Sequence, residues 1–228
     1  MNSRSIDFST VLASSVHDMK NSLCLLIQSI ETLRMKFTEE QEEEAQELAQ
    51  IHYEASRLNS NLLQMLALYR ARKDALPINI EEWFLDDLID DLLTKNELYI
   101  SNKHLAIEVD IDIDLSWYFD NDLVSNLLND IFVNAMRYCK KHIHISACET
   151  EEGLELAISD DGQGYPEDML VSSNSMPKEI DFTTSRTGLG IYFAELIASS
   201  HCQDGKVGKI SLENGGMLNG SVFRLVLP

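Results

Sequence analysis

The chain of 228 residues contains few cysteines, few basic residues and no long hydrophobic runs. Its four cysteines are Cys24, Cys139, Cys148 and Cys202, and none has CxxC or metal-ligand spacing. This excludes a disulfide scaffold and indicates reduced thiols in a cytoplasmic protein. No stretch approaches the roughly 18 apolar residues needed to span a bilayer, and the first residues lack the layout of a signal peptide. We therefore expect no membrane insertion.

The shortage of basic residues gives the chain a strong negative charge. It has 18 Lys and Arg against 38 Asp and Glu, a formal net charge of −20. Residues 1–72 carry 7 basic and 10 acidic side chains, a net of −3, and the other 156 carry 11 and 28, a net of −17. Such a surface is unsuited to a phosphate backbone, so we expect no nucleic-acid partner. The 44% of hydrophobic residues indicates an ordinary globular protein of one or two domains.

Two stretches near the N-terminus carry apolar residues at heptad spacing. The first comprises Leu12, Val16, Met19, Leu23, Leu26, Ile30, Leu33 and Phe37, and the second comprises Leu48, Ile51, Ala55, Leu58, Leu62, Met65 and Tyr69. They predict two long helices joined by a charged turn at Glu39–Glu47, which is best interpreted as a solvated turn and helix start. A two-helix hairpin buries such seams poorly alone, so we predict a homodimer with a four-helix bundle.

After the second seam, Pro77 ends the helical pattern and alternating stretches begin. Strands are expected at 106–113, 142–148, 154–159, 209–213 and 222–227, and helices at 84–98, 121–139 and 188–200. The predicted fold class is α+β, with an N-terminal two-helix hairpin that dimerises and then an α/β sandwich. The expected division is a helical domain at 1–72, a linker at 73–80 and a second domain at 81–228.

The first candidate site lies on the first helix. His17 and Asn21 are one turn apart on one face, and Asp18 adjoins the histidine. A neutral imidazole beside a carboxylate on an exposed helix is a suitable nucleophile for a phosphoryl group. Taken alone, this pattern also fits an exposed histidine with no role.

A second candidate is the polar stripe Asp130, Asn134 and Arg137, which share one face of a predicted helix. Carboxylate and amide oxygens suit Mg²⁺, and a guanidinium suits phosphate. We expect the opposite positions, Leu127, Leu128, Phe132 and Ala135, to pack inward. Alone, the stripe also fits the polar face of an amphipathic helix.

Three glycine-containing segments follow. Asp160–Pro166 comes directly after a predicted strand, Thr187–Gly190 begins a predicted helix, and Gly220–Ser221 enters the last strand. Glycines permit close backbone approach, a carboxylate at a strand end accepts from an exocyclic amine, and amides at a helix start can bind phosphate. Each segment alone also fits an ordinary turn.

In this order, the five motifs resemble those of the catalytic core of two-component sensor histidine kinases, which belong to the GHKL ATPase superfamily. The resemblance extends from about Ser9 to Pro228. His17–Leu23 is similar to the family's H-box and Asp130–Tyr138 to its N-box. The three glycine segments are similar to its glycine boxes.

The resemblance implies an ATP-dependent protein-histidine kinase that phosphorylates His17 and passes the phosphoryl group to an aspartate of a response regulator. Asp18 would act as the base, and Asn21 would orient a water for dephosphorylating that regulator. Mg²⁺ would be held by Asn134, with Asp130 as a further ligand or a base.

The remaining implied contacts are to ATP. The implied ATP-binding residues are Asp130, Asn134, Arg137, Tyr138, Asp160, Gly162, Gly164, Arg186, Gly188, Leu189, Gly190 and Ser221. Among them Arg137 would contact the triphosphate, Asp160 would accept from the adenine amine, and Ser221 would support the adenine site. Gly162 and Gly164 would shape the pocket, and Gly188 and Gly190 would flank the phosphates.

The chain departs from the family pattern at several points. Ser22 stands where the family usually has Pro, and Asp130 where Asn is common. The lid between Pro166 and Gly188 is short, and Lys178 and Arg186 are its only cations. Because no sensor segment precedes the H-box, we expect a separate input protein. The alternative function is a kinase-like adaptor or phosphotransfer protein with little or no ATP turnover.

Overall fold

The computed structural model describes residues 8–34, 42–71, 76, 78–172 and 189–228. The chain divides into two compact units, Met1–Ala75 and Leu76–Pro228. Each unit is described by itself below. None of the described helices is both long enough and apolar enough to cross a membrane.

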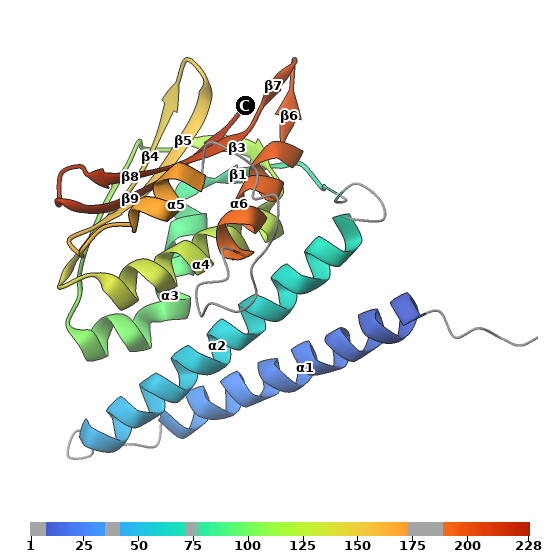
Figure 1. Cartoon of the computed structure of the whole chain (residues 1–228). Coiled ribbons are helices and arrows are strands. Elements are labelled where there is room, and N and C mark those ends of the chain that lie inside the picture. The colour runs from blue at the N-terminus through green and yellow to red at the C-terminus, as the bar shows by residue number, and fades with distance from the viewer. Residues whose placement is uncertain (1–7, 35–41, 72–75, 77, 173–188) are drawn as a thin grey trace, which may run out of the picture. The chain divides into compact units, whose positions relative to one another are not determined.

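The N-terminal unit consists of two long helices, α1 (Phe8–Arg34) and α2 (Glu42–Ala71), which pack against each other (Figure 1). The helix α1 continues through Ser22, whose hydroxyl donates to the carbonyl oxygen of Asp18 at 2.9 Å. A proline at this position would remove a backbone donor and clash with the preceding turn. Serine therefore lets the helix run on past the residues that resemble the H-box.

The heptad seams are only partly covered in this unit. Ile30 of α1 and Ala55 of α2 are buried, whereas Met19, Leu26 and Ile51 keep about half of their surface exposed, at 55%, 47% and 52%. Apolar side chains at regular helical spacing rarely stay exposed on this scale without a function. The exposed side chains leave an apolar face on the hairpin.

The C-terminal unit is a mixed α+β domain. Its elements are β1 (Glu81–Phe84), α3 (Leu85–Lys103), β2 (Ala106–Ile111), β3 (Ser116–Phe119), α4 (Asn121–Tyr138), β4 (His142–Thr150), β5 (Gly153–Asp160), α5 (Glu167–Ser172), α6 (Leu189–Ser200), β6 (Cys202–Gln203), β7 (Lys206–Val207), β8 (Lys209–Gly215) and β9 (Gly220–Leu227). The main sheet has the order β2-β4-β5-β9-β8, in which only the β2–β4 pair is parallel. The predicted α+β class with a largely antiparallel sheet is confirmed.

The core of this unit lies between the main sheet and its helices, which cover one face of the sheet (Figure 1). The largest fully buried side chains are Phe119, Phe132, Phe223, Leu85, Ile89, Leu127, Leu128, Met136, Ile143, Ile145, Leu154 and Leu156. Along β4, Ile143 and Ile145 alternate with polar residues, as expected for a strand with one packed face, whereas β9 is buried along most of its length. This packing places the C-terminal end of α4 beside the start of β4 and the end of β5.

Two buried polar residues connect the start of α4 to the end of α6. Asp120 caps α4, because its Oδ1 accepts from the N–H of Leu123 at 3.0 Å. The ring of His201 is only 2% exposed, and its Nε2 accepts from the N–H of Asp120 at 3.1 Å. Its Nδ1 lies 2.8 Å from the carbonyl oxygen of Ile197. A donor on one side and an acceptor on the other select the neutral tautomer with the proton on Nδ1.

The structure differs from the sequence-based expectations mainly in short elements. The antiparallel ribbon of β1 and β3 and the helix α5 were not predicted. The strand expected at 106–113 ends at Ile111, and Asp114 then takes a positive φ of 58° in the turn before β3. The first helix is described as far as Arg34, and Phe37, the last residue of the predicted seam, lies outside the described residues.

Candidate nucleotide-binding site

The site is centred on Asp160, the last residue of β5, whose side chain is 2% exposed. Its Oδ1 accepts from the backbone N–H of Gly162 at 2.7 Å and from that of Ser221 at 3.4 Å. Its Oδ2 accepts from the hydroxyl of Ser221. A buried carboxylate held by three donors is fixed in orientation, and each of its oxygens still has capacity to accept. Asp160 can therefore present an acceptor to a ligand donor.

Two glycines around Asp160 are required by close contact. A Cβ on Gly162 would lie 2.5 Å from the carbonyl oxygen of Tyr138 and 2.7 Å from Oδ1 of Asp160. A Cβ on Gly220 would lie 2.1 Å from the carbonyl oxygen of Asp160. Any other residue at either position would push the neighbouring backbone segments away from each other. The first and last glycine segments of the sequence therefore meet at the end of β5.

The neighbouring Asp161 holds the end of α4 against the start of β4. Its carboxylate accepts from the backbone N–H of Lys140 at 2.7 Å and of Lys141 at 3.0 Å, and it lies 3.1 Å from Nδ1 of His142. Burial by itself would raise the pKa of Asp161, but the hydrogen bonds from Lys141, His142 and Lys140 outweigh it and lower the pKa to about 2. Asp161 is thus an ionised structural anchor beside the site.

The helix α4 brings its polar stripe to this position. Leu127, Leu128, Phe132 and Ala135 are buried, which confirms the predicted inner face. On the other side Asn134 and Arg137 are exposed, and Asp130 is half-buried. The guanidinium of Arg137 lies 5.4 Å from the ring centroid of Tyr138, which is itself exposed. The amide and the guanidinium are both exposed on the surface of α4.

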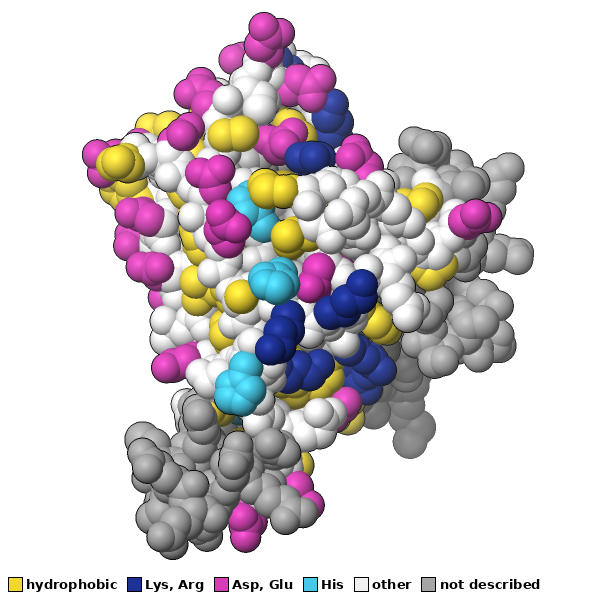
Figure 2. Space-filling model, turned by 90° about the vertical axis from the view of Figure 1, so that its left-hand side faces the viewer, with side chains coloured by type: hydrophobic (Ala, Val, Ile, Leu, Met, Phe, Trp, Pro, Cys, Tyr) yellow, Lys and Arg dark blue, Asp and Glu magenta, His cyan; other side chains and the backbone are white. Residues whose placement is uncertain are grey.

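Basic side chains surround the C-terminal end of α4, although the chain as a whole is acidic. The ammonium of Lys103 donates to the carbonyl oxygen of Met136 at 3.3 Å, and Lys140 and Lys141 are exposed just beyond the helix. On the face that Figure 2 shows, Lys, Arg and His side chains gather near the centre, while acidic side chains spread over the upper part. Cations at a helix C-terminus are stabilised by the helix dipole. They also offset the net charge of −17 near a site that would receive phosphate.

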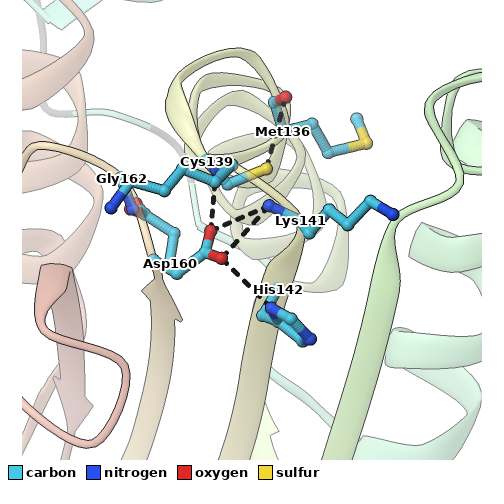
Figure 3. Close-up of polar contacts among 8 residues, drawn as sticks. Met136, Cys139, Lys141, His142, Asp160 and Gly162 are labelled. Atoms are coloured by element: carbon cyan, nitrogen blue, oxygen red, sulfur yellow. Dashed lines mark hydrogen bonds and ion pairs between the residues drawn. The ribbon is translucent and has the colours of Figure 1, made fainter.

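Cys139 lies between these elements and takes no part in the site chemistry. Its thiol donates to the carbonyl oxygen of Met136 at 3.5 Å (Figure 3). Burial, together with the charge of Asp161, raises the pKa of Cys139 to about 11. The thiol therefore stays protonated near neutral pH. All four cysteines of the chain are free, as expected.

Two residues of the site were not predicted from the sequence. The side-chain amide of Asn214, at the end of β8, accepts from the N–H of Tyr165 at 2.6 Å and donates to its carbonyl oxygen at 2.8 Å. Tyr165 follows the second glycine of the first glycine segment, and burial raises the pKa of its hydroxyl to about 12. Tyr165 stood inside a motif that the sequence singled out. Asn214 is 49 residues away in the chain, and no sequence pattern links the two.

Other predicted site residues are placed only in part. His17 lies within α1, but its side chain, like that of Leu189, is outside the described residues. Arg186 and Gly188 lie wholly outside them, as does Lys178. Asp18 and Asn21 are exposed on α1, and Gly190 lies in the first turn of α6.

Two polar side chains on α4 are suited to hold a Mg²⁺ ion that is also coordinated by a triphosphate. Within the described part of the chain, no three His, Cys, Asp or Glu side chains are grouped to hold a metal ion by themselves. Mg²⁺ commonly takes one or two protein oxygens and completes its shell with phosphate oxygens and water. The exposed amide oxygen of Asn134 and the half-buried carboxylate of Asp130 are one turn apart on α4 and suit that role.

A comparison with known families covers the segment that contains this site. Residues 119–228 match the family described as histidine kinase-, DNA gyrase B-, and HSP90-like ATPase. The match begins at the end of β3 and includes α4, Asp160, the glycines that contact it, and Ser221. The C-terminal unit is a GHKL ATPase domain of the sensor histidine kinase type.

Individual relatives agree with this assignment. The chain is 23% identical over 194 residues to the virulence sensor histidine kinase PhoQ of Salmonella typhimurium, a match that covers 85% of this chain and 39% of the relative. It is 24% identical over 200 residues to the sensor protein PhoQ of Escherichia coli, covering 88% of this chain and 40% of that protein. The chain thus spans about two fifths of the length of these curated relatives.

Solved structures share the fold. The Acinetobacter baumannii histidine kinase AdeS superposes with a TM-score of 0.60 at 19% identity, covering 91% of this chain and 95% of that one. The catalytic domain of the histidine kinase ThkA gives a TM-score of 0.56 at 24% identity, covering 66% and 97%. The kinase ATPase fold of this chain is therefore supported independently of the motifs.

Proposed function

We propose that the chain is an ATP-dependent protein-histidine kinase that autophosphorylates His17 and transfers the phosphoryl group to an aspartate of a response regulator. The observation that carries the proposal is the buried carboxylate of Asp160, fixed by Gly162 and Ser221 beside the polar face of α4. The ATPase family match supports nucleotide binding at this place. The H-box residues on α1 supply the phosphate acceptor.

The C-terminal unit would bind ATP with its base at Asp160 and its phosphates along α4. The carboxylate accepts the hydrogen bond of the adenine amine, and Gly162 and Gly220 let the backbone pack closely around Asp160. Arg137 donates its N–H groups to the triphosphate, and Asn134 with Asp130 would hold Mg²⁺. Mg²⁺, when bound, neutralises phosphate charge and orients the phosphates for in-line transfer. A domain with a net charge of −17 would otherwise repel the nucleotide.

The helical unit would supply the nucleophile. In the proposed step an imidazole nitrogen of His17 forms the new bond to the γ-phosphorus, the bond from that phosphorus to the bridging oxygen breaks, and ADP leaves. Asp18, exposed next to His17, accepts the imidazole proton. Asn21 is one turn further along the same helix, where its amide can orient a water. That geometry suits dephosphorylation of the partner regulator as a second activity.

The exposed apolar face of the hairpin supports the proposed homodimer. Met19, Leu26 and Ile51 would be covered if a second hairpin packed against them in a four-helix bundle. A response regulator is the proposed acceptor of the phosphoryl group. A separate sensor or input protein and a cytoplasmic location remain predictions from the sequence.

The test is labelling of the full chain with Mg·ATP that carries a labelled γ-phosphate. The wild type is expected to acquire an acid-labile, alkali-stable label, and His17→Ala is expected to acquire none. His104→Asn is a matched control, because His104 is exposed and its positive φ of 51° is readily adopted by asparagine. A label of equal strength in His17→Ala would refute the assignment of the phosphorylated residue.

A folded wild type that binds ATP but takes up no label would favour a kinase-like adaptor or a phosphatase. These two are separated by incubating the protein with a phosphorylated receiver domain and following release of inorganic phosphate. Release that requires Asn21 indicates a phosphatase, whereas an unchanged receiver indicates an adaptor.

A further inference from the structure

We propose that the open edge of β2 binds an extended segment of another protein, in which basic residues alternate with aliphatic ones, and that this segment adds a strand to the main sheet. β2 is the end strand in the order β2-β4-β5-β9-β8, and among the described residues no strand pairs with its other side. An edge strand presents a row of unpaired backbone N–H and C=O groups, which are the groups that strand addition uses. This edge takes no part in the nucleotide site described above.

The backbone groups that face the open edge belong to every second residue of β2. The N–H of Ala106 donates to the carbonyl oxygen of Lys141 at 2.8 Å, so the groups of Ala106 point toward β4. Because hydrogen-bonding groups alternate between the two sides of a strand, the even-numbered residues of β2 bond to β4 and the odd-numbered ones do not. The residues whose N–H and C=O groups face the open edge are therefore Ile107, Val109 and Ile111.

The side chains along this edge are sorted between the two faces of the sheet. Residues 108–114 alternate strictly between acidic and aliphatic side chains, in the order Glu-Val-Asp-Ile-Asp-Ile-Asp. Val109 is paired with Ile145 of β4, which is buried in the core, so the aliphatic side chains of β2 lie on the face that the helices cover. Glu108 and Asp110 lie on the opposite face. An added strand would therefore meet acidic side chains on one face and aliphatic ones on the other.

Neither set of side chains is covered within the C-terminal unit. Val109 keeps 43% of its surface exposed, although it lies on the helix-covered face, and Ile113, in the turn after β2, is 93% exposed. Glu108 and Asp110 are exposed as well, and neither forms an ion pair with another described residue. Exposed aliphatic side chains beside unpaired backbone groups are suited to strand addition.

The acidic row determines which kind of strand can pair here. Two copies of this edge would place carboxylates beside carboxylates, which disfavours pairing between copies of the chain. The negative charge acts on the neighbouring strand, because the pKa of Cys148 is raised by burial and by nearby carboxylates that include Asp112 and Asp110. A segment with Lys or Arg at alternate positions would place them beside Glu108 and Asp110, and its aliphatic residues beside Val109. Opposite charges on neighbouring strands stabilise their pairing.

The test measures the binding of two labelled peptides to the full chain by fluorescence anisotropy. One peptide alternates, Lys-Val-Lys-Val-Lys-Val-Lys, and the other has the same composition in blocks, Lys-Lys-Val-Val-Val-Lys-Lys. Only the alternating peptide places all its lysines on one face of a strand, so it is expected to bind about fivefold more tightly. Equal affinities would show that charge alone attracts the peptides, and would overturn the inference.

Val109→Pro tests the backbone contact, because it removes one edge N–H that the pairing with β4 does not use. Proline is tolerated on an edge strand when its nitrogen faces solvent, so the unit should stay folded, which tryptophan fluorescence checks. The variant is expected to bind the alternating peptide about fivefold more weakly, whereas the control Val109→Thr, which keeps the N–H and the branched shape, should match the wild type. Wild-type affinity in folded Val109→Pro would overturn the inference.

A double variant, Glu108→Gln with Asp110→Asn, tests the selection by charge without changing the backbone. Both side chains are exposed, so the fold should be unaffected. The variant is expected to lose the preference for the alternating peptide and to show a weaker dependence of binding on salt. A preference equal to that of the wild type would contradict the role of the acidic row.

Amide hydrogen exchange, followed by NMR, locates the bound peptide. Binding should slow exchange at Ile107, Val109 and Ile111, and should change it little at Glu108 and Asp110, whose N–H groups already bond to β4. Protection confined to other parts of the chain would overturn the inference. Self-association of the wild type that is lost in Val109→Pro would assign the edge to a second copy and would overturn it too. None of these outcomes bears on the proposed kinase activity, which the labelling experiment tests separately.

Discussion

Asp161→Asn is expected to destabilise the C-terminal unit in a pH-dependent way. The native pKa of Asp161 is about 2, against an ordinary value of 3.8. The difference corresponds to about 2 kcal/mol of stabilisation when the carboxylate is ionised in both states. The asparagine keeps one acceptor but turns its NH₂ toward the donors of Lys140, Lys141 and His142. At neutral pH the variant should therefore lose about 2 kcal/mol of unfolding free energy.

The sign of the pH dependence follows from the lowered pKa. The stabilisation is complete above the unfolded pKa and is lost as the pH falls toward the native value. At pH 3 the unfolded carboxyl is mostly protonated while the native one is mostly ionised, so about half of the difference between wild type and Asp161→Asn should remain. Near pH 2 most of it should have disappeared.

Urea unfolding followed by tryptophan fluorescence measures this difference directly. Both tryptophans of the chain, Trp83 and Trp117, belong to the C-terminal unit, so the helical hairpin does not contribute. Asp110→Asn is a matched control, because Asp110 is exposed on β2. A difference that is small at pH 7, or that grows toward acid pH, would show that Asp161 does not act as an ionised anchor.

Two further substitutions test contacts around the site. Gly162→Ala should weaken ATP binding more than tenfold, because its Cβ would lie 2.5 Å from the Tyr138 carbonyl oxygen. In the control Gly205→Ala the Cβ meets open space, and the strain of its positive φ of 80° stays within the turn between β6 and β7, so ATP should bind normally. Equal affinities of Gly162→Ala and the wild type would contradict the close packing. His201→Gln should lower the unfolding free energy by about 1–3 kcal/mol, because glutamine cannot keep both buried hydrogen bonds of the ring. An unchanged urea midpoint would show that these two hydrogen bonds contribute little to stability.

Regular patterns of hydrophobic residues predicted the main elements of the fold. In β4, β5 and β8 polar residues stand between apolar ones, β9 is a mostly buried apolar run, and α4 has one apolar face. These patterns made the elements evident from the sequence. The ribbon of β1 and β3 was missed because each strand has only four residues and most of their side chains are exposed or half-buried. Short strands with little burial leave no periodic pattern.

Within the candidate site, the sequence predicted the local contacts but not the contacts between distant segments. Asp160 and Gly162 lie in one short segment, and their motif indicated both the carboxylate and the need for close approach. Two other contacts, that of Gly220 with Asp160 and that of Asn214 with Tyr165, join segments that are far apart in the sequence. Such contacts depend on strand order and register, which no local pattern specifies.

The central claim is that the carboxylate of Asp160 receives the base of ATP. The most direct measurement is calorimetric titration of Mg·ATP into the full-length chain and into Asp160→Asn, with tryptophan fluorescence as the check that each is folded. The account predicts one site per chain in the wild type. It also predicts a loss of about tenfold or more in the variant, whose NH₂ group would oppose the adenine amine. Equal affinities, or no binding to the folded wild type, would contradict it.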